Sequence, residues 1–241
     1  MDIILPPQII WIYWHQGVEQ APEVVRKCIS SWKELNPSYE VRVLDRHAVV
    51  KFVDTDLLAY NKAAKKSLAA YSDVLRINLL EKYGGIWVDS TLLCLQPLSQ
   101  WLERKEYDFF AFSNPGPDRM VSSWFLAADR ESYIVQQWKK ACDAYWSRWK
   151  LKRPYYWLHY LFGEIYNSDE LFKERWDFVE KINSDGPHHL TPFRQKFFEE
   201  ATAERKTKLL GQNSPVLKLT YKCLQDGYPR GSMIDYVLHE L

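Results

Sequence analysis

The sequence predicts an α/β fold in which helices flank a mixed, mainly parallel central sheet. Residues 8–44 follow in the order strand, helix, strand, and this order implies a right-handed βαβ unit. A second signal lies at residues 71–91, where a helical pattern ends at two glycines and a short apolar segment follows. With 241 residues, the chain is long enough to bury a substantial core.

The βαβ unit begins with an apolar, aromatic segment at residues 8–14, which favours a strand and is closed by a polar loop. A helix follows from Pro22, because proline suits a first helical turn, and Asn36-Pro37 ends it. Residues 39–44 alternate as a second strand. The apolar face of the helix is formed by Val24, Val25, Cys28, Ile29 and Trp32.

The next segment, residues 46–53, is expected to be helical because Val49, Val50 and Val53 share one face of a helix. Asp54-Thr55-Asp56 then begins a further helical turn at 57–60. An alanine- and lysine-rich segment leads from there into the stretch at 71–91.

That stretch carries the most informative pattern. Its apolar residues have helical spacing, and Gly84-Gly85 suits a left-handed helix terminus because glycine adopts positive φ without steric cost. Residues 86–88 are apolar on both faces, as in a central strand. Asp89 follows directly and should lie at the strand's carboxyl end, where open α/β sheets bind ligands.

The second half of the chain contains weaker signals. After an extended segment at 92–97 and a helical turn at 98–102, strands are expected at 109–112 and 124–128, on either side of a loop at 114–118. Helices are expected at 132–149 and 155–166, and the tail beyond Asp185-Gly186-Pro187 should be loop-rich with short strands around 216–221. One domain over 1–241 is expected, although the last 90 or so residues could form a helical subdomain.

Composition excludes several classes of protein. A formal net charge of +1 gives no argument for nucleic-acid binding. There is no G-x-x-x-x-G-K-[ST] or G-x-G-x-x-G motif, so ATP P-loop and dinucleotide sites lack support.

The four scattered cysteines indicate reduced, mostly buried thiols, and no signal peptide or membrane span is recognised. A cytoplasmic protein is expected. Aromatic residues reach 15%, which suits carbohydrate binding and a plain core equally.

Asp73 and Arg76 are the first candidate site residues. They are three positions apart and therefore share a helix face, where the ordinary explanation is a local ion pair. The same stretch, however, directs Asp89 to a ligand-binding edge. A carboxylate that accepts ribose or base hydrogens, an arginine facing phosphate and a carboxylate near a metal together suit a nucleotide diphosphate.

These residues also carry a family resemblance. Ser72-Asp73 with Arg76, followed by Tyr83-Gly84-Gly85-Ile86-Trp87-Val88-Asp89, resembles the S-D-x-x-R…Y-G-G-[IV]-[YW]-x-D signature of GT-A glycosyltransferases, which include Och1-type mannosyltransferases and clostridial toxin glucosyltransferases. Among these, the bacterial capsular polysaccharide synthesis protein family is the most similar. The resemblance covers residues 8–98 and continues thinly beyond them.

The resemblance implies a GT-A (Rossmann-like) fold and a set of roles. Tyr13 and Trp14 would pack around the nucleobase, Asp73 and Arg76 would hold the donor's nucleotide and sugar-phosphate, and Trp87 would lie beside the nucleotide. Asp89 would be the first acid of the D-x-D metal motif. Residues of about 1–130 would form the nucleotide-sugar-binding part, and about 131–241 would form the helix-rich acceptor part.

One position departs from the family pattern, because Thr91 stands where the second acid of D-x-D is expected. A neutral hydroxyl is a poorer ligand for Mg²⁺ or Mn²⁺ than a carboxylate. Either a divalent metal is held by Asp89, Thr91 and a further ligand, or cations alone neutralise the diphosphate. His188 or His189 could be that ligand, and His189 is the one we expect. Lys218 and Lys222 could contact the diphosphate. Ordinary surface residues remain the alternative for all four.

Other candidates carry less weight. A literal D-x-D occurs at Asp54-Thr55-Asp56, where helix capping is the preferred explanation. The aromatic and basic segment at 145–157 could contact an acceptor sugar or an anionic lipid headgroup, whereas core packing is the alternative. No catalytic residue is assigned, and Asp118 is only a guess for a base.

The expected function is therefore transfer of a sugar from a nucleotide-diphosphate donor to a bacterial surface glycan, capsule or lipopolysaccharide, with retention of anomeric configuration as the resemblance implies. Peripheral contact with the inner face of the plasma membrane is compatible with this function. The alternatives are a catalytically degenerate domain that binds a nucleotide sugar, and a transferase that acts on a protein acceptor.

Overall fold

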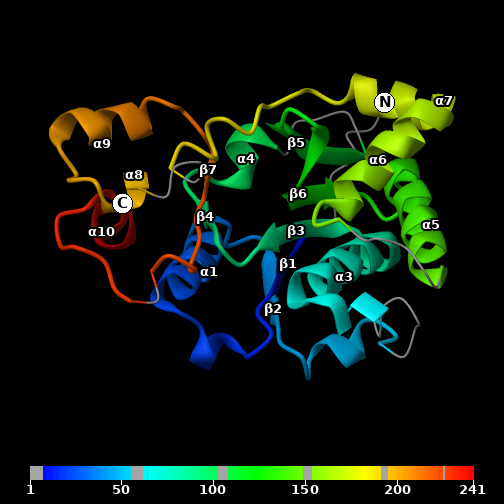
Figure 1. Ribbon diagram of the computed structural model, residues 1–241, viewed down its shortest axis with the longest axis horizontal. Coiled ribbons are helices and arrows are strands. Elements are labelled where there is room, and N and C mark those ends of the chain that lie inside the picture. The colour runs from blue at the N-terminus through cyan, green and yellow to red at the C-terminus, as the bar shows by residue number, and fades with distance from the viewer. Residues whose placement is uncertain are drawn as a thin grey trace.

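A five-stranded sheet with the order β2-β1-β3-β6-β5 forms the centre of the computed structural model (Figure 1). The structure describes residues 8–55, 62–63, 65–102, 108–148, 154–190, 195–224 and 226–241. β1 pairs in parallel with β2 and β3, whereas β6 is antiparallel to β3 and β5, so four strands share one direction. The predicted α/β fold with a mainly parallel sheet is confirmed. The strands are β1 (Ile9–Tyr13), β2 (Glu40–Leu44), β3 (Gly85–Asp89), β5 (Phe109–Gly116) and β6 (Arg119–Ala128).

The predicted βαβ unit is also confirmed, with α1 (Glu23–Leu35) between β1 and β2. Trp32 on α1 donates its indole N–H to the Leu92 carbonyl at 2.7 Å. Asn36, which ends the helix, accepts the Leu98 N–H at 2.8 Å through its side-chain oxygen. These contacts attach α1 to β4 (Leu92–Cys94) and α4 (Leu98–Trp101).

The helix predicted over 46–53 is wrong in extent, since only a 3₁₀ turn, η2 (Val49–Lys51), forms there. Asp45 Oδ1 accepts the N–H groups of His47 and Ala48 at 2.8 and 2.7 Å, which bends the chain into a turn. Val50 is 59% exposed, so the three valines do not form one buried face. The helical turn predicted at 57–60 lies outside the described residues.

The two glycines behave as predicted. α3 (Leu68–Tyr83) is capped by the Ser67 side chain and ends at Gly84, whose φ is 66° and whose N–H donates to Leu80 O at 2.8 Å. Gly85 has a φ of 93°, and a Cβ there would lie 2.7 Å from the Ile9 carbonyl oxygen. Only glycine therefore lets β3 lie beside β1 immediately after the helix.

The β5–β6 hairpin is longer than predicted. Gly116 pairs with Arg119, so the expected loop at 114–118 shrinks to Pro117-Asp118. The register shifts between Ala111 and Ser113, a bulge that alternation alone does not reveal.

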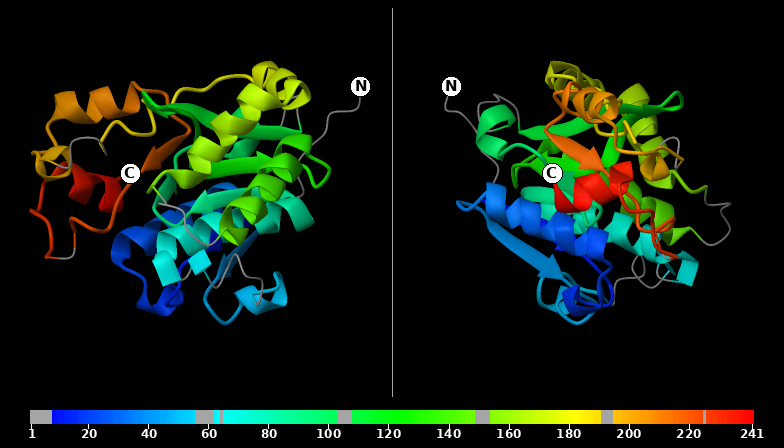
Figure 2. Two further views of the ribbon diagram at one scale, coloured as in Figure 1. Left: turned by 45° about the vertical axis from the view of Figure 1, so that its right-hand side comes forward. Right: turned by 90° about the vertical axis from the view of Figure 1, so that its left-hand side faces the viewer.

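The remaining helices are α5 (Tyr133–Ser147), α6 (Trp157–Ser168), α7 (Glu170–Phe178), α8 (Gln195–Phe198), α9 (Ala203–Leu210) and α10 (Met233–His239). α8, α9 and α10 gather at one end of the molecule, and α5 and α7 lie at the other (Figures 1 and 2). The C-terminal part is helix-rich as expected, but the tail beyond Pro187 contains helices where loops were predicted. β7 (Val216–Lys218), in the region of the expected short strands, pairs antiparallel with β4.

Large aromatic side chains fill much of the core. Trp11, Trp32 and Trp87 are almost fully buried in the sheet region, and Trp138 and Trp176 in the helical region. Much of the tryptophan content is therefore structural. Cys28, Cys94 and Cys142 are buried free thiols. Among the described residues, no helix has both the length and the hydropathy that crossing a bilayer requires.

Candidate functional site

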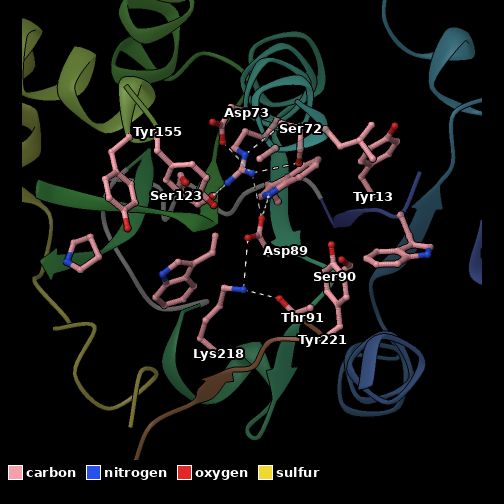
Figure 3. Close-up of a pocket in the computed structure, with 18 of the residues that line it drawn as sticks. Tyr13, Ser72, Asp73, Asp89, Ser90, Thr91, Ser123, Tyr155, Lys218 and Tyr221 are labelled. Atoms are coloured by element: carbon pink, nitrogen blue, oxygen red, sulfur yellow. Dashed lines mark hydrogen bonds and ion pairs between the residues drawn. The ribbon is translucent and has the colours of Figure 1, made fainter. Parts of the chain in front are cut away.

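A cavity of about 630 Å³ opens at the carboxyl edge of β1 and β3 (Figure 3). Tyr13 at the end of β1 is paired in register with Asp89 at the end of β3, so both side chains reach the same edge of the sheet. The cavity brings together all of the expected donor-binding and diphosphate-contacting residues, which are Tyr13, Trp14, Asp73, Arg76, Trp87, Asp89, Lys218 and Lys222, and also Thr91.

Arg76 is a buried cation that joins three elements. Its Nη2 lies 3.1 Å from Asp73 Oδ1 and 3.3 Å from Asp89 Oδ1. Its Nη1 donates to the carbonyl of Ser123 on β6, and Nε donates to the carbonyl of Ser72 at 3.3 Å. With a residue exposure of 4%, this charge depends on protein partners such as these for its stabilisation.

The two carboxylates beside Arg76 have different electrostatic environments. Burial, opposed by Arg76, raises the pKa of Asp73 to about 6. Burial alone would raise the pKa of Asp89 as well, but the neighbouring Arg76 and Lys218 outweigh it and hold that pKa below its ordinary value. Asp89 therefore stays ionised at acidic pH values below about 6, at which Asp73 becomes protonated.

Trp87 contacts both Arg76 and Asp89. The Arg76 guanidinium lies 5.0 Å from the centre of its ring, and the indole N–H donates to Asp89 Oδ1 at 3.0 Å. Trp87 is 1% exposed, so its contribution to the cavity is chiefly to orient Arg76 and Asp89. Its expected place beside a nucleotide stays a prediction.

Lys218 approaches from the other side of Asp89, as Figure 3 shows. Its Nζ lies 3.8 Å from Asp89 Oδ2 and donates to Thr91 Oγ1 at 2.5 Å. Lys218 is paired with Leu92 in the β4–β7 ladder, and the Leu219 N–H donates to the Thr91 carbonyl at 2.8 Å. The backbone thus places the ammonium beside the residues of the D-x-D position.

The residues around Asp89 do not fit a divalent cation as they stand. Such an ion needs several oxygen ligands directed at one point, whereas the Asp89 carboxylate accepts from Trp87 and pairs with Arg76, and the Thr91 hydroxyl accepts from Lys218. Across the described part of the chain, no three His, Cys, Asp or Glu side chains gather in metal-binding geometry.

The structure does not bring the expected third metal ligand, His189, to the cavity. His189 is half-buried, and its carbonyl accepts from Lys196 Nζ at 3.1 Å. Its neighbour His188 does line the cavity, with its ring centre 5.5 Å from that of Trp124. Burial, together with Lys218, lowers the pKa of His188 to about 4, so this ring is neutral at pH 7.

Aromatic rings line one side of the cavity. Trp14 packs edge-on against Tyr221, with ring centres 5.1 Å apart, and Tyr13 donates to or accepts from His15 at 2.7 Å. The indole N–H of Trp14 is buried without an acceptor among the described residues. A buried donor of this kind has a large desolvation cost unless a ligand supplies an acceptor.

The cavity lining also includes residues that the sequence did not single out as site residues. His159, near the start of α6, lines the cavity, and its Nδ1 is buried without a partner among the described residues. Burial and the nearby Arg76 lower its pKa to about 3. Arg119 and Trp124 come from β6. No sequence pattern marks a lone histidine or a strand carbonyl such as that of Ser123 as part of a site.

The segment at 145–157 divides between core and cavity. Trp146 and Trp157 are buried, while Tyr155 and Tyr156 line the cavity, with Tyr155 on the side away from Tyr13 (Figure 3). Residues 149–153, which carry most of the expected basic charge, lie outside the described residues.

The remaining acidic candidates are not among the residues that line this cavity. Asp118 does not line it and accepts a hydrogen bond from Tyr160 at 2.7 Å and one from Arg119 at 3.1 Å. Asp54 is exposed and also does not line the cavity, and Asp56 is outside the described residues.

Solved structures of glycosyltransferases resemble the fold. A structure named PaToxG glycosyltransferase aligns with a TM-score of 0.51 over 85% of this chain and 84% of that chain, at 13% identity. The glycosyltransferase GlyE of Streptococcus pneumoniae TIGR4 aligns with a TM-score of 0.52 over 97% of this chain and 59% of that chain, at 9% identity. At such identities the likeness concerns the fold alone, and the expected GT-A fold is confirmed.

Curated relatives match by sequence. Glycosyltransferase afumC of Aspergillus fumigatus is 29% identical over 156 residues, which is 57% of this chain and 40% of that protein. O-glycosyltransferase PaGT of Phomopsis amygdali is 24% identical over 163 residues, 56% of this chain and 40% of that protein. The matched region thus spans less than half the length of these relatives. The family model described as capsular polysaccharide synthesis protein matches residues 4–237, and the chain belongs to that family.

Proposed function

We propose that this chain is a glycosyltransferase that moves a sugar from a nucleotide-diphosphate donor to an acceptor hydroxyl. The observation that carries the proposal is the cluster of Asp73, Arg76 and Asp89 at the carboxyl edge of β3, inside a cavity that also contains Lys218 and Lys222. Ligands of open α/β sheets bind at this edge. Family membership and the names of the relatives support the same activity.

The cavity suits the two ends of such a donor. The rings of Tyr13, Trp14 and Tyr221 offer apolar surface for a nucleobase, and the buried Trp14 N–H offers a donor to one of its acceptors. Lys218 and Lys222 supply positive charge for the diphosphate, while Asp73 and Arg76 supply hydrogen-bonding groups for the sugar and its phosphate.

The residues would act mainly by positioning and electrostatics. When the sugar leaves, negative charge develops on the diphosphate, and fixed cations stabilise it without reorganisation. The cavity would hold the acceptor hydroxyl close to the anomeric carbon, which lowers the entropic part of the barrier. Retention of configuration is taken from the family resemblance, and no side chain is assigned as a base.

The acceptor is proposed only as a class. The family description suggests a capsule or other surface glycan, whereas a relative named as an O-glycosyltransferase suggests a hydroxyl on another kind of molecule. A glycan, small hydroxylated molecules and a protein should therefore all be offered as acceptors. If the acceptor is a surface glycan, the proposal includes peripheral contact of the protein with a membrane surface.

The test is release of nucleoside diphosphate from a panel of nucleotide sugars, with and without these acceptors. Wild-type protein should release diphosphate from at least one donor. Arg76→Lys keeps the charge but cannot reach Asp73, Asp89 and Ser123 together, so the rate should fall at least about 100-fold. Arg175→Lys, which changes a surface ion pair with Asp108, is the control and should change the rate little.

The competing function is a degenerate domain that binds a nucleotide sugar without transferring it. Thr91 at the D-x-D position favours this alternative. Binding of a donor without release under any acceptor condition would support it against the transferase. Absence of both binding and release would rule out both functions.

A further inference from the structure

Lys218 places its ammonium where the D-x-D arrangement would place a cation. Its Nζ lies 3.8 Å from Asp89 Oδ2 and 2.5 Å from Thr91 Oγ1, so it lies close to both side chains of that position. A divalent ion would have to approach the same two oxygens. An ion bound to these oxygens would lie close to the Lys218 ammonium and repel it. Only one of the two cations can use the Thr91 lone pair that accepts from Lys218.

The backbone holds Lys218 at this position. β7 pairs with β4, which begins one residue after Thr91, and the Lys218 N–H donates to the Pro187 carbonyl at 2.8 Å. The Lys218 side chain is 16% exposed, unlike an ordinary surface lysine. The backbone of Lys218 is therefore held by a strand ladder and a loop carbonyl, and its ammonium by two side chains of the site.

Thr91 is an uncharged hydrogen-bond partner for the Lys218 ammonium. A threonine hydroxyl accepts the ammonium hydrogen bond without adding negative charge, so part of the lysine charge remains available to an anion in the cavity. A carboxylate at this position would instead add negative charge and a second oxygen ligand for a divalent ion. Arg76 and Lys222 add positive charge to the same cavity, and the neighbouring rings of His159 and His188 are neutral.

We infer that this protein binds its nucleotide-diphosphate donor and transfers the sugar without a divalent metal, with the Lys218 ammonium in the metal's place. This inference rests on the proposed function. In the transfer, the bond from the anomeric carbon to the diphosphate oxygen breaks, and its electron pair stays on that oxygen beside Lys218. The acceptor oxygen bonds to the anomeric carbon, and its proton is released with the products.

The test is calorimetric titration of UDP, GDP, ADP and TDP into the protein, in EDTA and in Mn²⁺. Wild-type affinity for the preferred nucleotide should differ by less than about threefold between the two conditions, because no binding energy comes from the metal. Lys218→Met, which keeps the apolar stem, should bind at least about tenfold more weakly in EDTA. Lys208→Met on the exposed face of α9 is the matched control and should bind like wild type.

A double variant, Thr91→Asp with Lys218→Met, restores the second acid and removes the ammonium. Its nucleotide affinity should become metal-dependent, and an affinity that does not respond to Mn²⁺ would contradict a shared place for ammonium and ion. Thermal unfolding near the wild-type temperature establishes that each variant is folded.

The wild-type protein alone can overturn the inference, whatever the variants do. A loss of about tenfold or more in nucleotide affinity on removal of metal would show that a divalent ion takes part in binding. Equal affinities of wild type and Lys218→Met in EDTA would also overturn it. If wild type binds none of the nucleotides in either condition, the proposed function fails instead.

Discussion

Arg76 is the residue on which the charges of the cavity depend. It connects Asp73 on α3 with Asp89 on β3 and also donates to the Ser123 carbonyl on β6. Removing one partner of a buried ion pair leaves an uncompensated charge and typically costs about 3–5 kcal/mol. The cavity is therefore electrostatically prepared before any ligand arrives.

Asp73 gives a prediction that depends on pH. Its folded pKa of about 6 lies above the ordinary 3.8. The protonated Asp73 carboxyl stabilises the folded protein fully below pH 3.8. This stabilisation is lost as the pH rises through the folded pKa of about 6. Compared with Asp73→Asn, the wild-type free energy of unfolding should fall by up to about 3 kcal/mol between pH 4 and pH 7.

Urea unfolding of both proteins at the two pH values measures this difference. Asp143→Asn is the control, because Asp143 is an exposed carboxylate paired with Lys139 one turn away on α5. The pH dependence of the Asp73→Asn difference should exceed that of the Asp143→Asn difference. If the two are equal, the burial of the Asp73 carboxylate does not disfavour its ionised form.

At the scale of elements, the junction of α3 and β3 determines where Asp89 lies. Gly85→Ala would place a methyl group 2.7 Å from the Ile9 carbonyl oxygen at a φ of 93°. We expect a loss of at least about 2 kcal/mol in the free energy of unfolding, from backbone strain and from displacement of β3 against β1. Thermal or urea unfolding measures the loss.

Gly163→Ala is the matched control for this substitution. Gly163 lies within α6, and a Cβ there would meet nothing within 4 Å. Because alanine favours the helix over glycine, this variant should be stabilised by about 0.5–1 kcal/mol. If both variants shift stability in the same direction and by similar amounts, the close approach of β3 to β1 is not the cause.

The elements that the sequence predicts well are those with local signals. α1 has an apolar face and a clear end at Asn36, and β3 follows a glycine pair. The predicted helix over 46–53 was wrong because the Asp45 side chain bonds to the backbone of His47 and Ala48. α7 and α9 were missed although Asp169 and Thr202 cap them, since their apolar patterns are short.

Only the part of the site that has a local sequence signal could be predicted. Asp73, Arg76 and Asp89 lie within one short stretch, and their spacing and order indicate a common site. Lys218 was named as a candidate, but its hydrogen bond to Thr91 joins residues 127 positions apart. That contact depends on the pairing of two three-residue strands, β4 and β7, which have too little sequence pattern to predict.

At the scale of the whole molecule, the cavity draws on distant parts of the chain. Tyr13 comes from β1, Asp89 from β3, His159 from α6 and Lys218 from β7. The division into a nucleotide-sugar-binding part and an acceptor part stays a prediction, although Tyr13 and Tyr155 do lie on opposite sides of the cavity (Figure 3). A donor would contact elements from both parts at once.

The central claim is that this cavity binds a nucleotide diphosphate, and calorimetric titration with UDP, GDP, ADP and TDP tests it most directly. Lys222 is exposed and lines the cavity, so Lys222→Ala removes a cavity charge with little effect on folding, and Lys208→Ala removes a charge elsewhere. Wild type and Lys208→Ala should bind one nucleotide with similar affinity, and Lys222→Ala should bind it about tenfold more weakly. Equal affinity of all three proteins, or no binding by wild type, would contradict the account.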